Sequence, residues 1–296
     1  MPGLVVRHGP IVTPDMLPGA DGANINGPSL IRVPDWLSAP LGRYYLYFAH
    51  HQGTYIRLAY ADVLAGPWRI HPGGVLALAE CPFVYGHIAS PDVHVDEANK
   101  TIVMYFHGPS VAEREQMTFA AVSEDGLGFA TFPAVFGPSY ARVFSDRGWR
   151  YGIFGAENQR LGRSRTGLSK FESGPRLFPL ANGTDPSVRH VATQKIGKRL
   201  RIYYSRRRDA PERILFVDVD LNDDWTTWRI SAAQELMRPQ TIYEGTDMQL
   251  TPSKTGIARG REQALRDPAI YEENGRTMLL YAVAGEQGIA LAEILS

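Results

Sequence analysis

Residues 86–108, GHIASPDVHVDEANKTIVMYFHG, have the pattern of one strand, a polar turn and a second strand. Residues 90–95 alternate polar and apolar side chains with the period of a β-strand, and residues 102–106 form an apolar run after a polar turn. A hairpin folded at this turn brings its two far ends together. We therefore expect the polar residues at those ends to face one functional side of the molecule.

The beginning of this hairpin recurs along the chain. Its signature is a small or acidic residue, a proline, any residue and an apolar residue. Each copy is followed by a second apolar run, such as residues 44–48 or 200–204, and most copies continue into a third strand, such as residues 55–60. The five openings are Gly27-Pro28, Ser90-Pro91, Gly137-Pro138, Asp185-Pro186 and Asp267-Pro268.

Five repeats of three or four short strands predict an all-β fold, a five-bladed β-propeller, because each small sheet needs neighbours to bury both of its faces. The predicted domain is a single propeller over residues 1–296, with blades that open near residues 27, 90, 137, 185 and 267. The prolines suit the first residue of a strand, where a missing N–H is tolerated. Leu4-Val5-Val6 is expected to add an outer strand to the last blade. The alternative is a β-sandwich with coincidental proline spacing, which the five matched pairs of runs disfavour.

Composition narrows the class of protein. The 296 residues include 29 Gly, 21 Pro and 10% aromatic residues, which favours β structure. Lys plus Arg equals Asp plus Glu at 31 each, so the net charge of zero supports neither a nucleic-acid partner nor a polybasic membrane contact. The lone Cys81 excludes an intramolecular disulfide and disfavours a cysteine-based zinc site. The start lacks the pattern of a signal peptide and no run has the length of a membrane span, so a soluble, cytoplasmic protein is expected.

The candidate site follows from propeller geometry. The entrance to each innermost strand and the turn between the second and third strands lie on the same face, and polar residues gather in these segments. The entrances contribute Asn24, Asn26, His87, Asp92, Asp185, Arg189, His190, Arg266 and Asp267. The turns contribute His50, His51, His107, Glu157, Arg206, Arg207, Arg208, Asp209, Glu212 and Glu286.

Each class of candidate also has a structural interpretation. Asp92 and Asp267 either organise the strand start by accepting backbone hydrogen bonds, or act in catalysis or ligand contact. The histidines either pack in the core or, as a group, ligate an axial divalent metal ion, although no sequential metal motif is present. The charged run at residues 208–213 is either a solvated loop or a binding segment for carboxylates or sugar hydroxyls. The tryptophans pack between blades or stack on sugars.

At this level the chain resembles the five-bladed propeller glycosidases, the superfamily that contains glycoside hydrolase family 43 and its relatives in families 32, 62, 68 and 117. The resemblance rests on the proline openings and on the segments at residues 42–48 and 60–68. It also rests on Ser90-Pro91-Asp92-Val93, which is similar to the Ala-Pro-Asp-Ile/Val opening of that superfamily. It covers nearly the whole chain as a pattern and implies a carbohydrate substrate.

Three openings depart from the family pattern. The resemblance implies a general-base or nucleophilic Asp in the first blade, where this chain has Asn26, whose amide is no base at neutral pH. It implies an Asp that tunes the acid in the third opening, which is Gly137-Pro138 here, and an acidic Glu in the fourth, which has Asp185-Pro186 and then Arg189-His190. The acid and the base are therefore expected elsewhere in the ring.

The predicted function is hydrolysis of a small or terminal carbohydrate in an axial pocket by carboxylate acid/base chemistry. The expected catalytic residues are Asp92, Asp267, Glu286 and His190. The expected substrate contacts are Asn26, His50, His51, His87, His107, Glu157, Asp185, Arg189, Arg208 and Arg266. Two alternatives stay open: a metal-dependent hydrolase or lyase that uses the axial histidines, and a non-catalytic carbohydrate-binding propeller.

Overall fold

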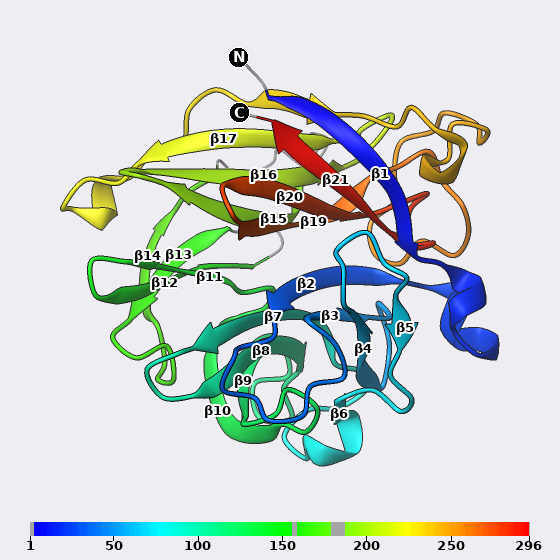
Figure 1. Cartoon of the computed structure of the whole chain (residues 1–296). Coiled ribbons are helices and arrows are strands. Elements are labelled where there is room, and N and C mark those ends of the chain that lie inside the picture. The colour runs from blue at the N-terminus through cyan, green and yellow to red at the C-terminus, as the bar shows by residue number, and fades with distance from the viewer. Residues whose placement is uncertain (1–2, 156–158, 179–186, 296) are drawn as a thin grey trace.

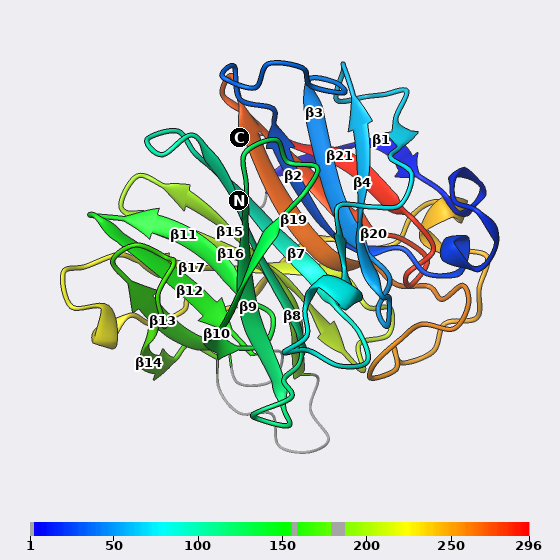
Figure 2. The same cartoon turned by 90° about the horizontal axis from the view of Figure 1, so that it is seen from below.

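A computed structural model describes residues 3–155, 159–178 and 187–295 of the chain. In these residues the strands form five antiparallel sheets arranged in a ring (Figures 1 and 2), which confirms the predicted five-bladed β-propeller. The helices of the described residues are short 3-10 turns, none long and apolar enough to cross a membrane. They are η1 (Pro14–Met16), η2 (Gly19–Ala23), η3 (Leu78–Glu80), η4 (Trp225–Thr227) and η5 (Ile242–Glu244).

The first four blades are each built in chain order from the innermost strand outward. The first has β2 (Asn26–Arg32), β3 (Tyr44–Ala49), β4 (Tyr55–Ala61) and β5 (Arg69–Ile70), and β6 (Leu76–Ala77) also pairs with β4. The second has β7 (Ala89–Asp96), β8 (Thr101–Pro109), β9 (Gln116–Ser123) and β10 (Ala130–Pro138). The third has β11 (Arg142–Asp146), β12 (Trp149–Phe154), β13 (Arg160–Ser164) and β14 (Glu172–Arg176). The fourth has β15 (Ser187–Ile196), β16 (Arg199–Arg207), β17 (Ile214–Asp220) and β18 (Gln234–Met237).

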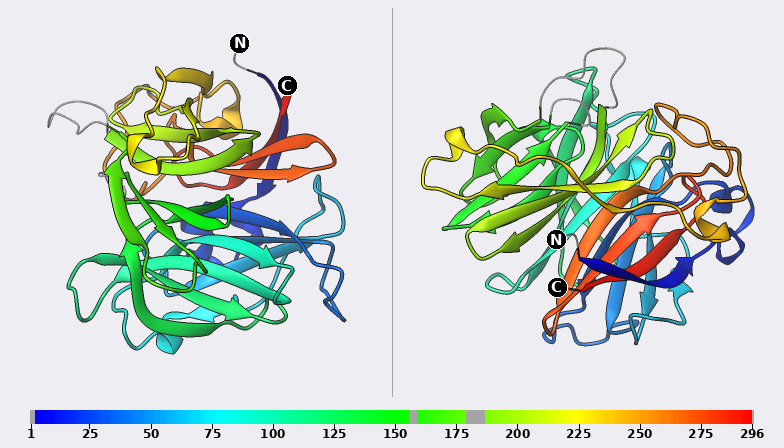
Figure 3. Two further views of the ribbon diagram at one scale, coloured as in Figure 1. Left: turned by 90° about the vertical axis from the view of Figure 1, so that its left-hand side faces the viewer. Right: turned by 90° about the horizontal axis from the view of Figure 1, so that it is seen from above.

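The fifth blade joins the two ends of the chain. It contains β19 (Arg266–Glu273), β20 (Arg276–Ala282), β21 (Ile289–Leu295) and, outermost, β1 (Leu4–Val12). Figure 3 shows the blue β1 beside the red β21, and the two strands pair antiparallel from Leu4 opposite Leu295. The N-terminal strand thus closes the ring, as the apolar residues at its start predict.

A proline-centred bulge opens three of the innermost strands. The register of β2, β7 and β19 with their neighbours shifts at the proline in each case. The residue before that proline has a positive φ, 61° at Gly27, 49° at Ser90 and 47° at Asp267. The missing N–H of proline costs no ladder hydrogen bond at a bulge, and the bulge turns the neighbouring side chains toward a new direction. In these three copies the signature therefore forms a bulge at the axis, not only a strand start.

The third opening differs from its prediction. Gly137 and Pro138 end β10, the outermost strand of the second blade, and β11 begins only at Arg142. Proline is tolerated on an edge strand as well as at a bulge, so the same short pattern occurs in two structural settings. The fourth predicted opening, Asp185-Pro186, lies outside the described residues, and β15 begins at Ser187.

Apolar clusters fill the interfaces between neighbouring blades. Within the described residues each of the five interfaces has its own cluster of buried side chains. The cluster between the first and second blades is the largest and contains Tyr47 and Phe106. The cluster between the second and third blades is the smallest and is centred on Tyr105, Phe136 and Phe154. Inter-blade burial thus holds the ring together, but unevenly.

Candidate functional site

A pocket of about 440 Å³ lies at the end of the propeller where the innermost strands begin. Its walls come from the first four blades and from the segment that precedes the fifth, so it lies on the axis of the ring. We term it the axial pocket. Its polar lining side chains include His51, Glu115, Gln116, Tyr140, Arg189 and His190. A concave site with a few convergent polar groups is the usual form of a small-molecule site.

His190 and Asp267 form a buried dyad at the wall of this pocket. Nδ1 of His190, on β15, is hydrogen-bonded to Oδ1 of Asp267, on β19. Burial lowers the pKa of His190 well below 6.5, and the nearby Arg142 and Arg189 act in the same direction. The imidazole is therefore neutral at pH 7. Its Nδ1–H donates to the carboxylate, which leaves Nε2 as the nitrogen with a free lone pair.

Tyr140 is held between two histidines. Its ring centroid lies 4.0 Å from that of His107 and 4.4 Å from that of His190. The φ of Tyr140 is 60°, a left-handed conformation that is rare for an aromatic residue and that occurs preferentially at functional sites. Burial lowers the pKa of His107 well below 6.5, so both rings that contact Tyr140 are neutral. The contact with Tyr140 limits the orientations open to His190.

Arg266 organises a network of buried charges behind the pocket. Its side chain is fully buried and contacts three carboxylates: Glu212 (Nε to Oε2, 3.0 Å), Glu262 (Nη2 to Oε2, 2.5 Å) and Glu286 (Nη1 to Oε1, 3.3 Å). Nε of Arg189 donates to the other oxygen of Glu212 at 2.8 Å. Buried charges are tolerated only when they are paired in this way. The network fixes Arg189 at the pocket wall.

Glu286 accepts hydrogen bonds at both carboxylate oxygens. Oε1 lies 3.1 Å from Nδ1 of His51, and Oε2 accepts from Nδ2 of Asn24 at 2.5 Å and from the backbone N–H of Ala258 at 3.1 Å. Burial by itself would raise the pKa of Glu286, but the bond to His51, the charge of Arg266 and the bond to Asn24 lower it to about 2. At neutral pH this side chain is an ionised group held by its neighbours.

Asp92 faces the central channel and lines a different, smaller cavity of about 190 Å³. Its Oδ2 accepts from the backbone N–H of Val143, in the third blade, at 2.7 Å and lies 2.9 Å from Nε2 of His94. Burial would raise the pKa of Asp92, but His94, Arg142 and the bond from Val143 lower it overall. This carboxylate joins the second blade to the third.

The remaining predicted residues are spread around the axial end. His51 and Arg189 line the pocket with His190, whereas Glu157 and Asp185 lie outside the described residues. Asn26 donates to Asn24 at 3.3 Å, His50 accepts from the N–H of Gln52 at 3.0 Å, His87 lies 3.1 Å from Gln116, and the N–H of Arg208 donates to Ser253 at 3.1 Å. Within residues 3–155, 159–178 and 187–295, no group of three or more His, Cys, Asp or Glu side chains is arranged to hold a metal ion.

Several residues that line the axial pocket lie outside the predicted set, among them Glu115, Gln116 and Tyr140. Glu115 is an exposed residue in the turn between β8 and β9, a kind of segment that propeller geometry assigns to this face. Its position was therefore available from the sequence, but no local pattern marked it. Tyr140 is the apolar residue of the signature that begins at Gly137-Pro138, and the signature predicts no contact with a site. Its role in the wall depends on the late start of β11.

A mimivirus protein is similar to this chain over most of its length. No model of a known protein family matches the chain. The uncharacterized protein R118 of Acanthamoeba polyphaga mimivirus is 36% identical over 299 aligned residues, which cover 92% of this chain and 83% of that protein.

Solved structures of family 43 glycoside hydrolases share the architecture at low identity. The GH43_1 enzyme from Xanthomonas citri superposes with a TM-score of 0.64 at 13% identity, covering 96% of this chain and 91% of that one. CoXyl43, a GH43 β-xylosidase/α-arabinofuranosidase from a compost microbial metagenome, gives a TM-score of 0.63 at 14% identity, covering 97% and 95%. Another structure of the Xanthomonas citri enzyme contains xylotriose. At such identities the likeness shows the shared fold.

Proposed function

The chain belongs to the family of the mimivirus protein R118, and we propose that it is a glycoside hydrolase that cleaves a small or terminal carbohydrate in the axial pocket. The observation that carries the proposal is the His190–Asp267 dyad at the wall of that pocket. The shared fold with family 43 enzymes, one of which is solved with xylotriose, supports a carbohydrate as the substrate class.

His190 is the proposed general base. Its neutral imidazole accepts a proton from the attacking water at Nε2 while Asp267 holds Nδ1–H and stabilises the imidazolium that forms. Asp267 is thus a positioning residue that acts through His190. The resemblance to family 43 implies a carboxylate base in the first blade, where this chain has Asn26. In this proposal the dyad supplies the base instead.

Glu115 is the proposed general acid. Cleavage of a glycosidic bond needs a proton on the leaving oxygen, which a carboxylic acid usually donates. Glu115 lines the rim of the axial pocket. Glu212 and Glu286 are less suited to the step because buried arginines already contact their carboxylates.

The other predicted residues take positioning and binding roles in this proposal. Glu286 holds His51, and Asp92 fixes the third blade against the second through Val143. His51, Tyr140 and Arg189 line the pocket and supply hydrogen-bonding groups and a ring face for a sugar.

A non-catalytic sugar-binding propeller is the second candidate. The observation that favours it is the engagement of Glu286, both of whose oxygens accept hydrogen bonds, combined with an amide at Asn26. A protein of this kind would bind carbohydrate in the same pocket without turnover.

Turnover of chromogenic glycosides separates the two candidates. The purified chain is incubated with a panel of 4-nitrophenyl glycosides that includes β-xylosides and α-arabinofuranosides, and with xylo-oligosaccharides. We expect at least one substrate to be cleaved, and His190→Ala to reduce its kcat by about 10²- to 10⁴-fold, the usual contribution of a general base.

The matched control is His71→Ala, because His71 is a half-buried histidine that follows β5 in the first blade. This variant should retain wild-type turnover. Sugar binding without cleavage across the panel would favour the second candidate, and a wild-type rate in His190→Ala would refute the role of the dyad.

A further inference from the structure

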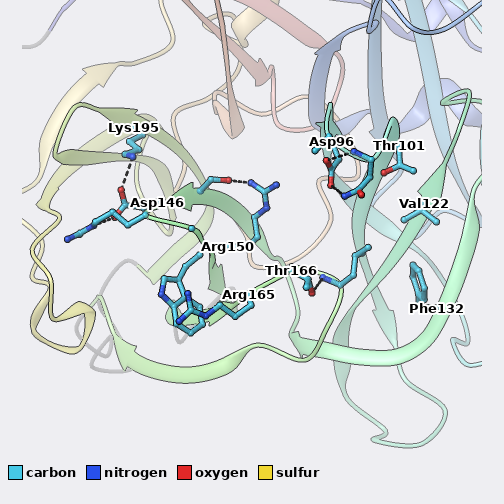
Figure 4. A pocket seen from close by; sticks show the side chains of 16 residues that line it. Asp96, Thr101, Val122, Phe132, Asp146, Arg150, Arg165, Thr166 and Lys195 are labelled. Atoms are coloured by element: carbon cyan, nitrogen blue, oxygen red, sulfur yellow. Dashed lines mark hydrogen bonds and ion pairs between the residues drawn. The ribbon is translucent and has the colours of Figure 1, made fainter.

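A cavity of about 1000 Å³ opens between the second and third blades, at the opposite end of their innermost strands from the axial pocket. Figure 4 shows Asp96, Thr101, Val122 and Phe132 of the second blade on one side of it. Asp146, Arg150 and Arg165 of the third blade and Lys195 of the fourth lie on the other side. We term this cavity the blade 2–3 groove.

The groove lies where the two blades are least tightly joined. β11 has five residues, whereas β7 has eight and β15 has ten. The apolar cluster between these blades is the smallest of the five in the described residues. The turn that follows β7 and the turn that follows β11 therefore form two separate walls rather than a packed interface.

The walls of the groove carry an excess of positive charge although the whole chain has a net charge of zero. Four cationic side chains and two carboxylates line it: Arg147, Arg150, Arg165 and Lys195 with Asp96 and Asp146. Asp146 is compensated by Arg147 at 2.8 Å and by Lys195 at 2.7 Å. Asp96 accepts from Nδ2 of Asn99 at 2.8 Å. The lining side chains therefore keep an excess of two positive charges. Among the described residues, Arg150 and Arg165 are the two of these four cations that form no ion pair within 4 Å, although the charge of Arg150 also lowers the pKa of Asp96.

Arg150 and Arg165 have no carboxylate partner within 4 Å among the described residues. Arg150 donates to the hydroxyl of Ser145. The guanidinium of Arg165, an exposed residue, lies 3.5 Å from the ring centroid of Trp149, on which it stacks. Stacking on an aromatic face orients a guanidinium without using its N–H donors. Both arginines line the groove with donors suited to a carboxylate.

Apolar surface lies beside these cations. Val122 and Phe132 are half-buried, and Leu168 is 38% exposed. A matching ligand combines negative charge with an apolar face and is larger than a simple inorganic anion. A pyranose ring with a carboxylate substituent has both properties, because its C–H face packs on apolar side chains while its carboxylate meets an arginine. The volume of the groove suits several such rings.

We propose that the blade 2–3 groove is a binding site for an oligosaccharide that carries carboxylate groups, a uronic-acid chain. Arg150 and Arg165 bind the carboxylates, and Val122, Phe132 and Leu168 contact the ring faces. The site is separate from the axial pocket and does not depend on the proposed hydrolase activity.

Calorimetric titration of the full chain with trigalacturonate at low ionic strength tests this proposal. We expect saturable binding that weakens as salt is added. The double variant Arg150→Gln/Arg165→Ala should bind at least about 10-fold more weakly, because each lost charge-assisted hydrogen bond contributes that much or more. Arg69→Ala removes an exposed arginine of the first blade, and His190→Ala alters the axial pocket; both should bind as the wild type does.

Several results would overturn the proposal. One is that trigalacturonate does not bind at millimolar concentration. A second is that the chain binds sulfate or phosphate but not trigalacturonate. Another is equal affinity for a neutral trisaccharide, since that would remove the role of charge. Wild-type affinity in the double variant would place the bound ligand elsewhere, and loss of binding in His190→Ala would place it in the axial pocket.

Discussion

Charged side chains cluster at both the axial pocket and the blade 2–3 groove, but the arginines at the two places are stabilised differently. Arg266, behind the pocket, is fully buried and contacts three carboxylates. Arg165, in the groove, is exposed and stacks on Trp149. A buried cation must be paired to be tolerated, whereas an exposed one is stabilised by water. The buried charges behind the axial pocket therefore stabilise the fold, whereas the exposed cations of the groove are accessible to a ligand.

The largest effect that follows from this comparison concerns Arg266. Arg266→Ala leaves Glu212 and Glu286 with fewer compensating charges in a buried setting, and removing one partner of such a pair typically costs about 3–5 kcal/mol. We expect a loss of this size in the free energy of unfolding, measured by urea denaturation.

Arg165→Ala is the matched variant in the groove. Because its side chain is exposed, the free energy of unfolding should stay within about 0.5 kcal/mol of the wild type. Similar losses for the two variants would contradict the contrast between paired and solvated cations.

Acid unfolding gives the next effect, and it belongs to Glu286. Its pKa is lowered from 4.5 to about 2 in the folded chain, so its contribution to stability is complete above the unfolded value and is lost as the pH falls from about 4.5 toward 2. The shift corresponds to roughly 3 kcal/mol. When urea unfolding is measured as a function of pH, the free energy of unfolding of Glu286→Gln should decrease much less than that of the wild type between about pH 4.5 and pH 2.

The control for this effect is Asp96→Asn in the groove. This carboxylate is half-buried, and its pKa is lowered first by the hydrogen bond from Asn99, so it should contribute much less to stability than the fully buried Glu286. An identical pH profile for Glu286→Gln and the wild type would show that the buried network does not depend on the charge of Glu286.

Local patterns in the sequence predicted the fold more fully than the site. The alternation of polar and apolar residues, the turn residues and the repeated proline signature each extend over only a few residues. These short patterns predicted the hairpins and the outer strand at Leu4. The dyad depends on His190 and Asp267, which are 77 residues apart and meet only when the fourth and fifth blades pack. Both residues were predicted as site residues, but their pairing was not. Asp92 was predicted as catalytic, whereas its bond to Val143, 51 residues away, suits a link between blades.

His190, oriented by Asp267, is the proposed general base in the axial pocket. The most direct measurement is kcat/KM of Asp267→Asn on a glycoside that the wild type cleaves. Asparagine has the shape of aspartate and tolerates the left-handed φ of 47° at this position, but its amide cannot stabilise an imidazolium. We predict that kcat/KM falls by about 10²- to 10⁴-fold while the unfolding midpoint stays close to that of the wild type. A folded Asp267→Asn variant with the kcat/KM of the wild type would refute the proposed role of the dyad.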